Sequence, residues 1–380
     1  MELILTEDQE LLAKTAADFV SEHSPVSRVR KLRDTKDPIG FSRTLWKHMA
    51  ELGWLGIPFP ESVGGAGLGF AELAVVLEAL GRTLAPEPFL SSVLLGGQVL
   101  RLGGSEAQQR EWLAPLVNGD CILTVAYQEA QSRYDLHRVA TRAEKGGNGW
   151  RLSGEKIQVL DGHVADALIV LARTSGSERD VRGLTLFLVP KGAPGLEITR
   201  QWRVDSRNSA LVKLSGVAVG PSEVIGAVDE GGELFEQVVD RATVGLCAEM
   251  LGSMEEAAAF TFKYLKTRVQ FGVPIGSFQA LKHRAARMYI ELELSRSTVM
   301  AAARAVDEDH PELPKLTSLV KARCSDAGIL IANEAIQMHG GVGMTDEYDV
   351  GFYLKRARVA EITFGDAAHH RARWARLSGY

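Results

Sequence analysis

The chain has few of the residues that build covalent or metal frameworks. Its 380 residues include only three cysteines, Cys121, Cys247 and Cys324, which are far apart and odd in number. This count argues against a disulfide framework, and the spacing is not that of a zinc site. We therefore expect a protein of the reducing cytoplasm that binds no metal.

Long apolar runs and a strong charge of one sign are also missing. No apolar stretch has the length needed to span a bilayer, and the net charge is only −5. Such a charge gives no general attraction to nucleic acid or to an anionic membrane surface, so neither is an expected partner. The start, M-E-L-I-L-T-E-D-Q-E, is acidic and unlike a signal peptide; it suggests a helix capped by Thr6.

The composition is that of a globular protein, with 46% apolar and 24% charged residues and room for two or three domains. Apolar residues recur at helical spacing from Thr6 to about Asn118. Two predicted helix faces are Leu11, Leu12, Thr15 and Phe19, and Leu73, Val76, Leu77 and Leu80.

The period then changes to that of strands. The β-rich runs are Trp150–Ile157, Ala167–Arg173 and Leu184–Val189, and long helical patterns return from Glu233 onward. Segregated helices and strands favour an α+β fold over a parallel α/β sheet. The prediction is an all-α domain over residues 1–118, a central β-barrel or sandwich domain over 119–229, and a helical domain over 230–380.

The segment Tyr264–Met288 is the most informative part of the chain. It places Arg268, Gln270, Phe271 and Gln279 around a short Gly/Pro-rich break between two helical patterns. A cation, a flat ring and two amides beside a helix start suit a ligand with a pyrophosphate and an aromatic base. The same residues also fit a simple helix–loop–helix corner with a solvated arginine.

A second segment, Gln337–Gly343, contains the consecutive glycines Gly340 and Gly341. They allow a sharp turn whose N–H groups approach a phosphate or ribose closely, although a glycine after a helix is also a common C-cap. The glycines of Pro58–Gly69 do not satisfy G-x-G-x-x-G, which excludes a Rossmann fingerprint there.

Together these segments resemble a known family. The pattern T-R-x-Q-F-G-x-P-I-G-x-F-Q-x-x-x-H resembles the FAD-contacting signature of the acyl-CoA dehydrogenase family, and Q-x-x-G-G-x-G resembles that family's second flavin turn. The resemblance covers essentially the whole chain and implies a helical domain, a β-domain and a C-terminal four-helix bundle. It also implies FAD as cofactor, an acyl-CoA substrate and an electron-transfer flavoprotein or similar acceptor.

The family resemblance further implies an oligomer. In that family these residues reach a flavin held mainly by a neighbouring subunit, so at least a homodimer is expected, and a tetramer is common. The FAD-binding residues carried over are Arg268, Gln270, Phe271, Gln279, Gln337, Gly340 and Gly341.

The β-domain departs from the family pattern. Tyr127–Tyr134 stands where the family has T-E-P-x-A-G-S-D, and Gln158 and Leu160 replace a tryptophan and a hydroxyl residue near the flavin. Because leucine cannot donate a hydrogen bond to flavin N5, either the flavin is tuned differently or the backbone supplies the donor.

The usual catalytic base is also missing. Removing a Cα proton next to a thioester needs a carboxylate with a raised pKa in a dry site. The resemblance places Phe364 at the glutamate of the family's I-Y-E-G-T motif. Isovaleryl-type relatives have the carboxylate on the first bundle helix instead, where this chain has Asp240.

Helical spacing agrees with Asp240, because the apolar residues Val244, Cys247, Leu251 and Met254 continue its face. The alternative is a surface aspartate near a helix start. Asp366 is the reserve candidate, whereas Glu361 is expected to be structural. His339 is expected to be packed or capping, and a metal at Asp366 and His370, which share a helix face, is not expected.

Two functions follow from this resemblance. The first is FAD-dependent α,β-dehydrogenation of an acyl-CoA, with the proton going to Asp240. The alternative is a non-catalytic FAD-binding subunit of a heteromeric dehydrogenase, such as a heterotetramer, because F-G-D-A-x-H-H resembles the small subunit of pimeloyl-CoA-type enzymes. A DNA-associated branch of the family is disfavoured, since the C-terminal arginines are interleaved with Ala and Glu as on a solvated helix.

Overall fold

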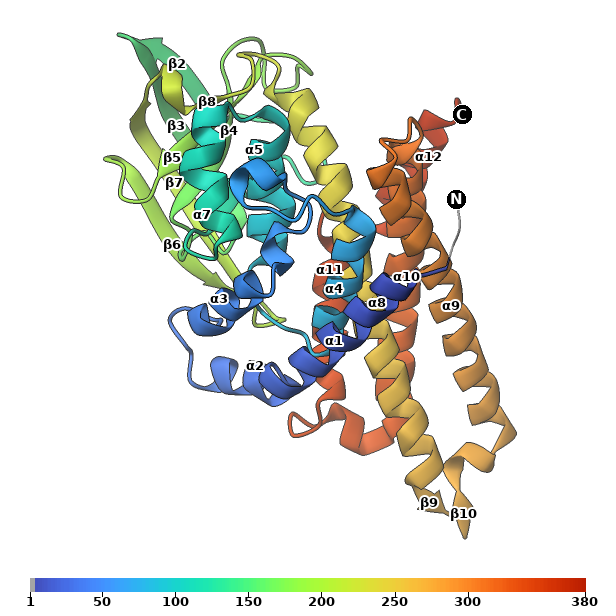
Figure 1. Ribbon diagram of the computed structural model, residues 1–380. Helices are drawn as coiled ribbons and strands as arrows, with labels where there is room; N and C mark the ends of the chain where they lie inside the picture. Colours follow the sequence, from blue (N-terminus) through green and yellow to red (C-terminus); the bar gives the residue numbers. More distant parts are fainter. Residues whose placement is uncertain (1–3) are drawn as a thin grey trace. The chain divides into compact units, whose positions relative to one another are not determined.

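The computed structural model describes residues 4–380, so the first three residues of the predicted N-terminal domain lie outside it (Figure 1). The chain divides into two compact units. A helical unit contains residues 4–35, 69–85 and 243–380, and a sheet unit contains residues 36–68 and 86–242. The boundary at residues 242 and 243 falls inside the longest helix, α8 (Gly231–Thr267).

Helices make up almost all of the helical unit. They are α1 (Glu7–His23), α2 (Val26–Asp34), α4 (Phe70–Arg82), α8 from residue 243, α9 (Gln279–Asp307), α10 (Leu313–His339), α11 (Val350–Ile362) and α12 (Ala367–Leu377). Between α8 and α9 lie the short strands β9 (Val269–Gln270) and β10 (Val273–Pro274) and the 3₁₀ turn Ile275–Ser277. The predicted C-terminal helical domain is thus confirmed in its element type.

The first helix begins as predicted and buries a different face. The Thr6 hydroxyl accepts a hydrogen bond from Gln9 N at 3.2 Å, and the Gln9 side chain accepts one from Thr6 N, so the two form a capping box. The buried residues of α1 are Gln9, Ala16 and Val20, whereas Leu11 is exposed. The predicted face containing Leu11 was wrong, because α1 packs on α4 through the stripe of Gln9, Ala16 and Val20. The adjacent leucines Leu11 and Leu12 are more apolar than that stripe and drew the prediction to the wrong face.

Two glycines bring α4 and α8 into backbone contact. A Cβ on Gly81 would lie 2.0 Å from the carbonyl oxygen of Glu249, and one on Gly252 would lie 1.8 Å from that of Glu78. Neither is possible without moving a helix. The contact is sealed by the Ser253 hydroxyl, which donates to the Gly81 carbonyl at 3.0 Å.

One mostly antiparallel sheet forms the centre of the other unit. Its strands are β1 (Leu123–Ala126), β2 (Arg142–Gly146), β3 (Gly149–Leu160), β4 (Ala167–Arg173), β5 (Leu184–Pro190), β6 (Leu196–Trp202), β7 (Asn208–Val219) and β8 (Val224–Ile225). The order is β6-β7-β3-β2-β4-β5-β8, and β1 pairs parallel to β4. The three β-rich runs of the sequence are therefore strands β3, β4 and β5.

Short helices complete the sheet unit. They are α3 (Arg43–Glu51), α5 (Gln98–Gly103), α6 (Glu106–Gln108) and α7 (Ala114–Val117), with π-helical segments at Phe89–Gly97 and Gln109–Leu113 and 3₁₀ turns at Trp54–Gly56, Glu61–Val63 and Pro221–Glu223. Helices thus precede the strands, as predicted, up to Val117. The domain limits at residues 118 and 229 stay a prediction.

The sheet core contains the alternating apolar residues of β3, β4, β5 and β7, among them Leu152, Val170, Phe187 and Val212. The pairing of β3 with β7 is irregular between Lys156 and Val159, and Gln158 in this interval has φ +53°. The interruption is a bulge, which turns the strand locally. It falls on the segment that departs from the family pattern.

Candidate functional site

The first predicted cofactor element forms a hairpin at the end of α8. Strands β9 and β10 pair through Gln270 and Val273, and the two residues between them, Phe271 and Gly272, have φ +53° and +80°. Positive φ at both central positions is the type I′ turn of tight hairpins. The Phe271 ring lies at the tip and is 93% exposed.

The polar members of this element are exposed as well. Arg268, Gln270 and Gln279 all lie at the surface, and Gln279 is the first residue of α9. Among the described residues, the Gln270 side chain donates to the neighbouring Val269 carbonyl alone, at 2.8 Å. An arginine, an amide and an aromatic ring are therefore presented beside a helix N-terminus, which suits an anionic ligand.

The second predicted element is the turn after α10, Gly340–Met344. Gly340 has φ +63°, and a Cβ on Gly340 or Gly341 would meet no atom within 4 Å. Open space around both glycines, with Gln337 exposed one helical turn earlier, leaves the backbone accessible to a ligand. This open, exposed turn is compatible with the predicted contact to FAD, which stays a prediction.

The two elements lie at the same end of the helical unit, where Figure 1 shows β9 and β10, and His339, next to the second element, contacts α8 just before the first. Its ring packs on Tyr264 of α8 at 4.4 Å between centroids, on Phe260 at 5.5 Å and on Tyr348 at 5.2 Å. Its Nδ1 is hydrogen-bonded to the Ala335 carbonyl at 2.7 Å. Burial lowers the pKa of His339. The expectation of a packed histidine is confirmed.

Asp240 lies in the third turn of α8 and is only 6% exposed. The apolar residues that follow on its helix face, Val244, Cys247 and Leu251, are buried too. Arg241 is buried beside it and donates to the Gln237 carbonyl at 3.2 Å. The alternative of a surface aspartate is therefore wrong about exposure, because the Asp240 side chain is buried.

The two other carboxylates considered as bases have structural contacts. Asp366 is the N-cap of α12, and its side chain accepts from His369 N at 2.9 Å. Glu361 forms an ion pair with Arg358 at 3.3 Å. Phe364, between them, has φ +62° and is 91% buried. No carboxylate thus occupies position 364, and Asp366 is engaged by the helix start.

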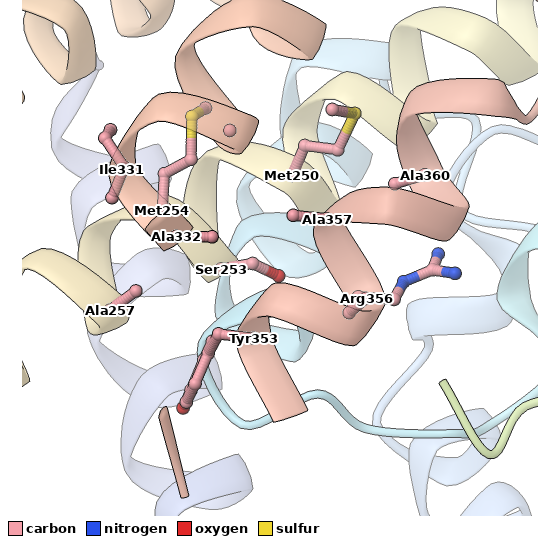
Figure 2. Close-up of a pocket in the computed structure, with 11 residues that line it drawn as sticks. Met250, Ser253, Met254, Ala257, Ile331, Ala332, Tyr353, Arg356, Ala357 and Ala360 are labelled. Atoms are coloured by element: carbon pink, nitrogen blue, oxygen red, sulfur yellow. The ribbon is translucent and has the colours of Figure 1, made fainter. Parts of the chain in front are cut away.

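The helices of the bundle pack closely around a small cavity (Figure 2). Its volume is about 20 Å³, roughly the space of one water molecule. The lining residues come from α8, α10 and α11: Met250, Ser253, Met254, Ala257, Gly328, Ile331, Ala332, Tyr353, Arg356, Ala357 and Ala360. The small residues here serve close helix packing, so this cavity is not a site for an acyl chain.

The segment that departs from the family pattern contains a buried ion pair that the sequence analysis missed. Lys156 Nζ lies 2.6 Å from Glu129 Oε1, and Glu129 also accepts from Ala140 N and Thr141 N. Burial would raise the pKa of Glu129, but the charge of Lys156 and these hydrogen bonds lower it to about 2. A Glu and a Lys 27 residues apart give no local signal, since no periodicity connects them.

No metal centre is formed in residues 4–380, where no three His, Cys, Asp or Glu side chains gather to hold an ion. The three cysteines are buried and unbridged. No helix between residues 4 and 380 is long and apolar enough to cross a membrane.

A helical unit, a mixed sheet and two exposed glycine-containing turns at one end of the helical unit agree with the family expected from the sequence. Comparison with known proteins agrees. The N-terminal, middle and C-terminal domain models of acyl-CoA dehydrogenase match residues 6–120, 124–215 and 229–378. The chain belongs to the acyl-CoA dehydrogenase family, whose members are FAD-dependent oxidoreductases.

Individual relatives cover nearly the whole chain. It is 34% identical to acyl-CoA dehydrogenase FadE27 of Mycobacterium tuberculosis over 334 residues, 86% of each chain. It is 31% identical to the mitochondrial isovaleryl-CoA dehydrogenase of Pongo abelii over 97% of this chain and 89% of the other. Among solved structures, the ChsE4-ChsE5 complex from Mycobacterium tuberculosis matches with a TM-score of 0.90 and 31% identity, covering all of both chains.

Proposed function

We propose that this chain dehydrogenates an acyl-CoA thioester between Cα and Cβ, with Asp240 as the base that removes the Cα proton. The observation that carries the proposal is the identity of the residues at positions 240 and 364, the two places where the family resemblance puts a catalytic carboxylate. Asp240 is a buried carboxylate on α8, whereas position 364 holds a phenylalanine. A buried carboxylate is a stronger base than one in water, because desolvation raises its pKa.

FAD, when bound, supplies the acceptor for the hydride that leaves Cβ. This chain's own part is to bind and orient. Arg268, Gln270, Phe271 and Gln279 would contact the dinucleotide from the hairpin side. The accessible backbone of Gly340 and Gly341, with Gln337, would contact it from the turn after α10. Because these groups point outward from the helical unit, the proposed flavin is shared with another subunit.

Leu160 remains a departure in this proposal. Its side chain cannot donate a hydrogen bond to flavin N5. Its carbonyl already accepts from the Thr124 hydroxyl at 2.6 Å. A donor to N5 would therefore have to come from a backbone N–H group, or the flavin would be tuned differently. Electrons would leave through an electron-transfer flavoprotein or a similar acceptor.

The test is an anaerobic titration of the purified protein with straight, branched and bulky acyl-CoAs, followed by flavin absorbance. Wild-type protein should bleach with at least one of them. Asp240→Asn should keep its FAD and lose bleaching by about two to four orders of magnitude, the range of general-base catalysis. Glu233→Gln, an exposed carboxylate in the first turn of the same helix, is the matched control. Normal bleaching by Asp240→Asn would refute the assignment.

A second candidate function is that of a non-catalytic, FAD-binding subunit in a heteromeric dehydrogenase. Two observations favour it: Phe364 at the usual base position, and full-length similarity to a structure described as a complex of two named chains. In this case the chain supplies flavin contacts, and a homologous subunit supplies the carboxylate. A protein that is colourless alone and retains FAD only with a homologous subunit would support this function. Bleaching by the isolated chain would exclude it.

A further inference from the structure

The connection between α11 and α12 has an unusual backbone. Phe364 has φ +62° and the following Gly365 has φ +117°. A positive φ at a bulky residue is a genuine outlier, and such conformations cost about 1–3 kcal/mol unless the surroundings hold them. Strain of this kind tends to persist where it has a function.

Buried side chains hold this turn from two directions. Lys321 of α10, which is completely buried, donates from Nζ to the Glu361 carbonyl at 2.8 Å and to the Gly365 carbonyl at 2.7 Å. His370 of α12 donates from Nε2 to the Phe364 carbonyl at 3.1 Å. Three carbonyls around the strained residue are thus bound by side chains of two other helices.

Placing a lysine here costs desolvation free energy, because its ammonium group is removed from water. Burial lowers the pKa of Lys321 to about 8, and within residues 4–380 its hydrogen-bond partners are all neutral: two carbonyls and the Ser325 hydroxyl at 3.1 Å. In the part of the chain that the structure describes, no carboxylate is hydrogen-bonded to it, and Glu361 and Asp366 offset the cost of removing the ammonium from water only through longer-range attraction. The charge is therefore retained for its ability to donate several hydrogen bonds at once.

Position 365 is equally restricted. A Cβ there would lie 2.6 Å from His369 Cδ2 and 2.9 Å from His370 Nε2. The glycine thus meets both the positive φ and the close approach of His370. The lysine and the histidine therefore bind the backbone on both sides of the Cα atom from which side chain 364 extends.

We propose that Lys321 is a positioning residue which, with His370, fixes the backbone of the turn Thr363–Asp366 and so orients the side chain at position 364. We call this fixed turn the mount. The proposal rests on the proposed function, since the family resemblance aligns Phe364 with the glutamate of the I-Y-E-G-T motif. In this chain the mount presents Phe364. A glutamate placed there would adopt the geometry of a base without any other change.

The first test concerns the backbone alone. Hydrogen exchange by mass spectrometry is compared for the wild type, Lys321→Met and the control Lys315→Met, a partly exposed lysine of the same helix. Exchange within residues 362–367 should rise about tenfold in Lys321→Met, because buried carbonyls lose their donor, and should not change in the control. Unchanged exchange in Lys321→Met would overturn the proposal.

His370 gives a second, independent pair of variants if Lys321→Met fails to fold. His370→Gln keeps an N–H donor for the Phe364 carbonyl, and His370→Leu removes it. The turn should exchange faster only in His370→Leu. Equal exchange in both variants would show that the histidine does not hold the turn.

The second test asks whether the mount positions a functional group. Phe364→Glu is introduced into Asp240→Asn, assembled with a homologous subunit if FAD binding requires one. Flavin bleaching by an acyl-CoA should rise about a hundredfold over Asp240→Asn alone. Adding Lys321→Met should remove this gain in kcat and leave KM unchanged, whereas Lys315→Met should not.

The outcomes separate the two proposals. Variants that hold no flavin in any assembly would refute the proposed function, while the exchange experiment still decides on the mount. A flavin-loaded Phe364→Glu without gain, or one whose gain survives Lys321→Met, would refute the mount.

Discussion

Lys156 in the sheet unit and Lys321 in the helical unit are both completely buried, and burial lowers the pKa of each to about 8. Their surroundings differ. Lys156 lies 2.6 Å from the carboxylate of Glu129, whereas Lys321 donates to two carbonyls and a hydroxyl. One lysine is paired directly with a buried carboxylate, whereas the other has its carboxylates, Glu361 and Asp366, only at longer range.

This difference shows what each lysine contributes. In the sheet unit the pair is self-contained: Glu129 binds the backbone of Ala140 and Thr141, and Lys156 balances its charge. In the helical unit the ammonium itself binds the backbone. Removing Lys156 therefore leaves a charge unpaired, and removing Lys321 leaves only neutral acceptors unpaired.

The largest effect is expected for Lys156→Met. It leaves the Glu129 carboxylate buried without its counter-charge, which costs about 3–5 kcal/mol in free energy of unfolding. Urea denaturation measures it, with the exposed Lys213→Met on β7 as control. The double variant Lys156→Met/Glu129→Leu should recover part of the loss. A single variant as stable as the wild type would show that Glu129 does not depend on the lysine.

A smaller effect is expected from protonation of His370. Burial and the charge of Lys321 lower the pKa of His370 to about 3, so the folded protein holds this histidine neutral. Below the unfolded pKa of about 6.5 the unfolded chain binds a proton that the folded chain does not, and stability falls as the pH decreases toward 3. Between pH 6.5 and 5 the loss should be about 2 kcal/mol.

His370→Gln removes this titration and keeps a donor for the Phe364 carbonyl. Urea midpoints measured at pH 7 and pH 5 should therefore differ less in His370→Gln than in the wild type. An identical pH dependence of the two proteins would show that His370 does not contribute to acid sensitivity.

The smallest effect is expected for Lys321→Met. Its three hydrogen bonds are lost, but the cost of burying an ammonium is lost with them, so the net destabilisation should be about 1 kcal/mol. Urea denaturation of this variant and of Lys156→Met under the same conditions compares the two losses in free energy of unfolding directly. A larger loss for Lys321→Met than for Lys156→Met would reverse the interpretation given above.

Much of the fold could be predicted from local patterns. The run Ala167–Arg173 coincides with strand β4, and the cap at Thr6 coincides with the start of α1. These features depend on neighbouring residues and leave a trace in the sequence. The buried face of α1 and the grouping of α4 with the C-terminal helices depend on residues far apart in the chain, which local periodicity does not encode.

The site was predictable to a similar degree. Two sequence segments about seventy residues apart were assigned to one cofactor, and the structure places both at one end of the helical unit through Tyr264 and His339. Their role in binding FAD stays a prediction, as does that of Asp240. Lys321 could not be found, since a lysine inside an amphipathic helix pattern reads as a surface residue until its burial is known.

The contact of α4 with α8 limits how this chain can vary. At Gly81 and Gly252 even alanine would place a carbon atom 2.0 Å or less from a carbonyl oxygen of the facing helix. Every single-nucleotide change of a glycine codon that alters the residue adds at least that carbon. No single amino-acid substitution at these two positions is therefore expected to be neutral in evolution. A substitution there requires that one helix first shifts along or away from the other.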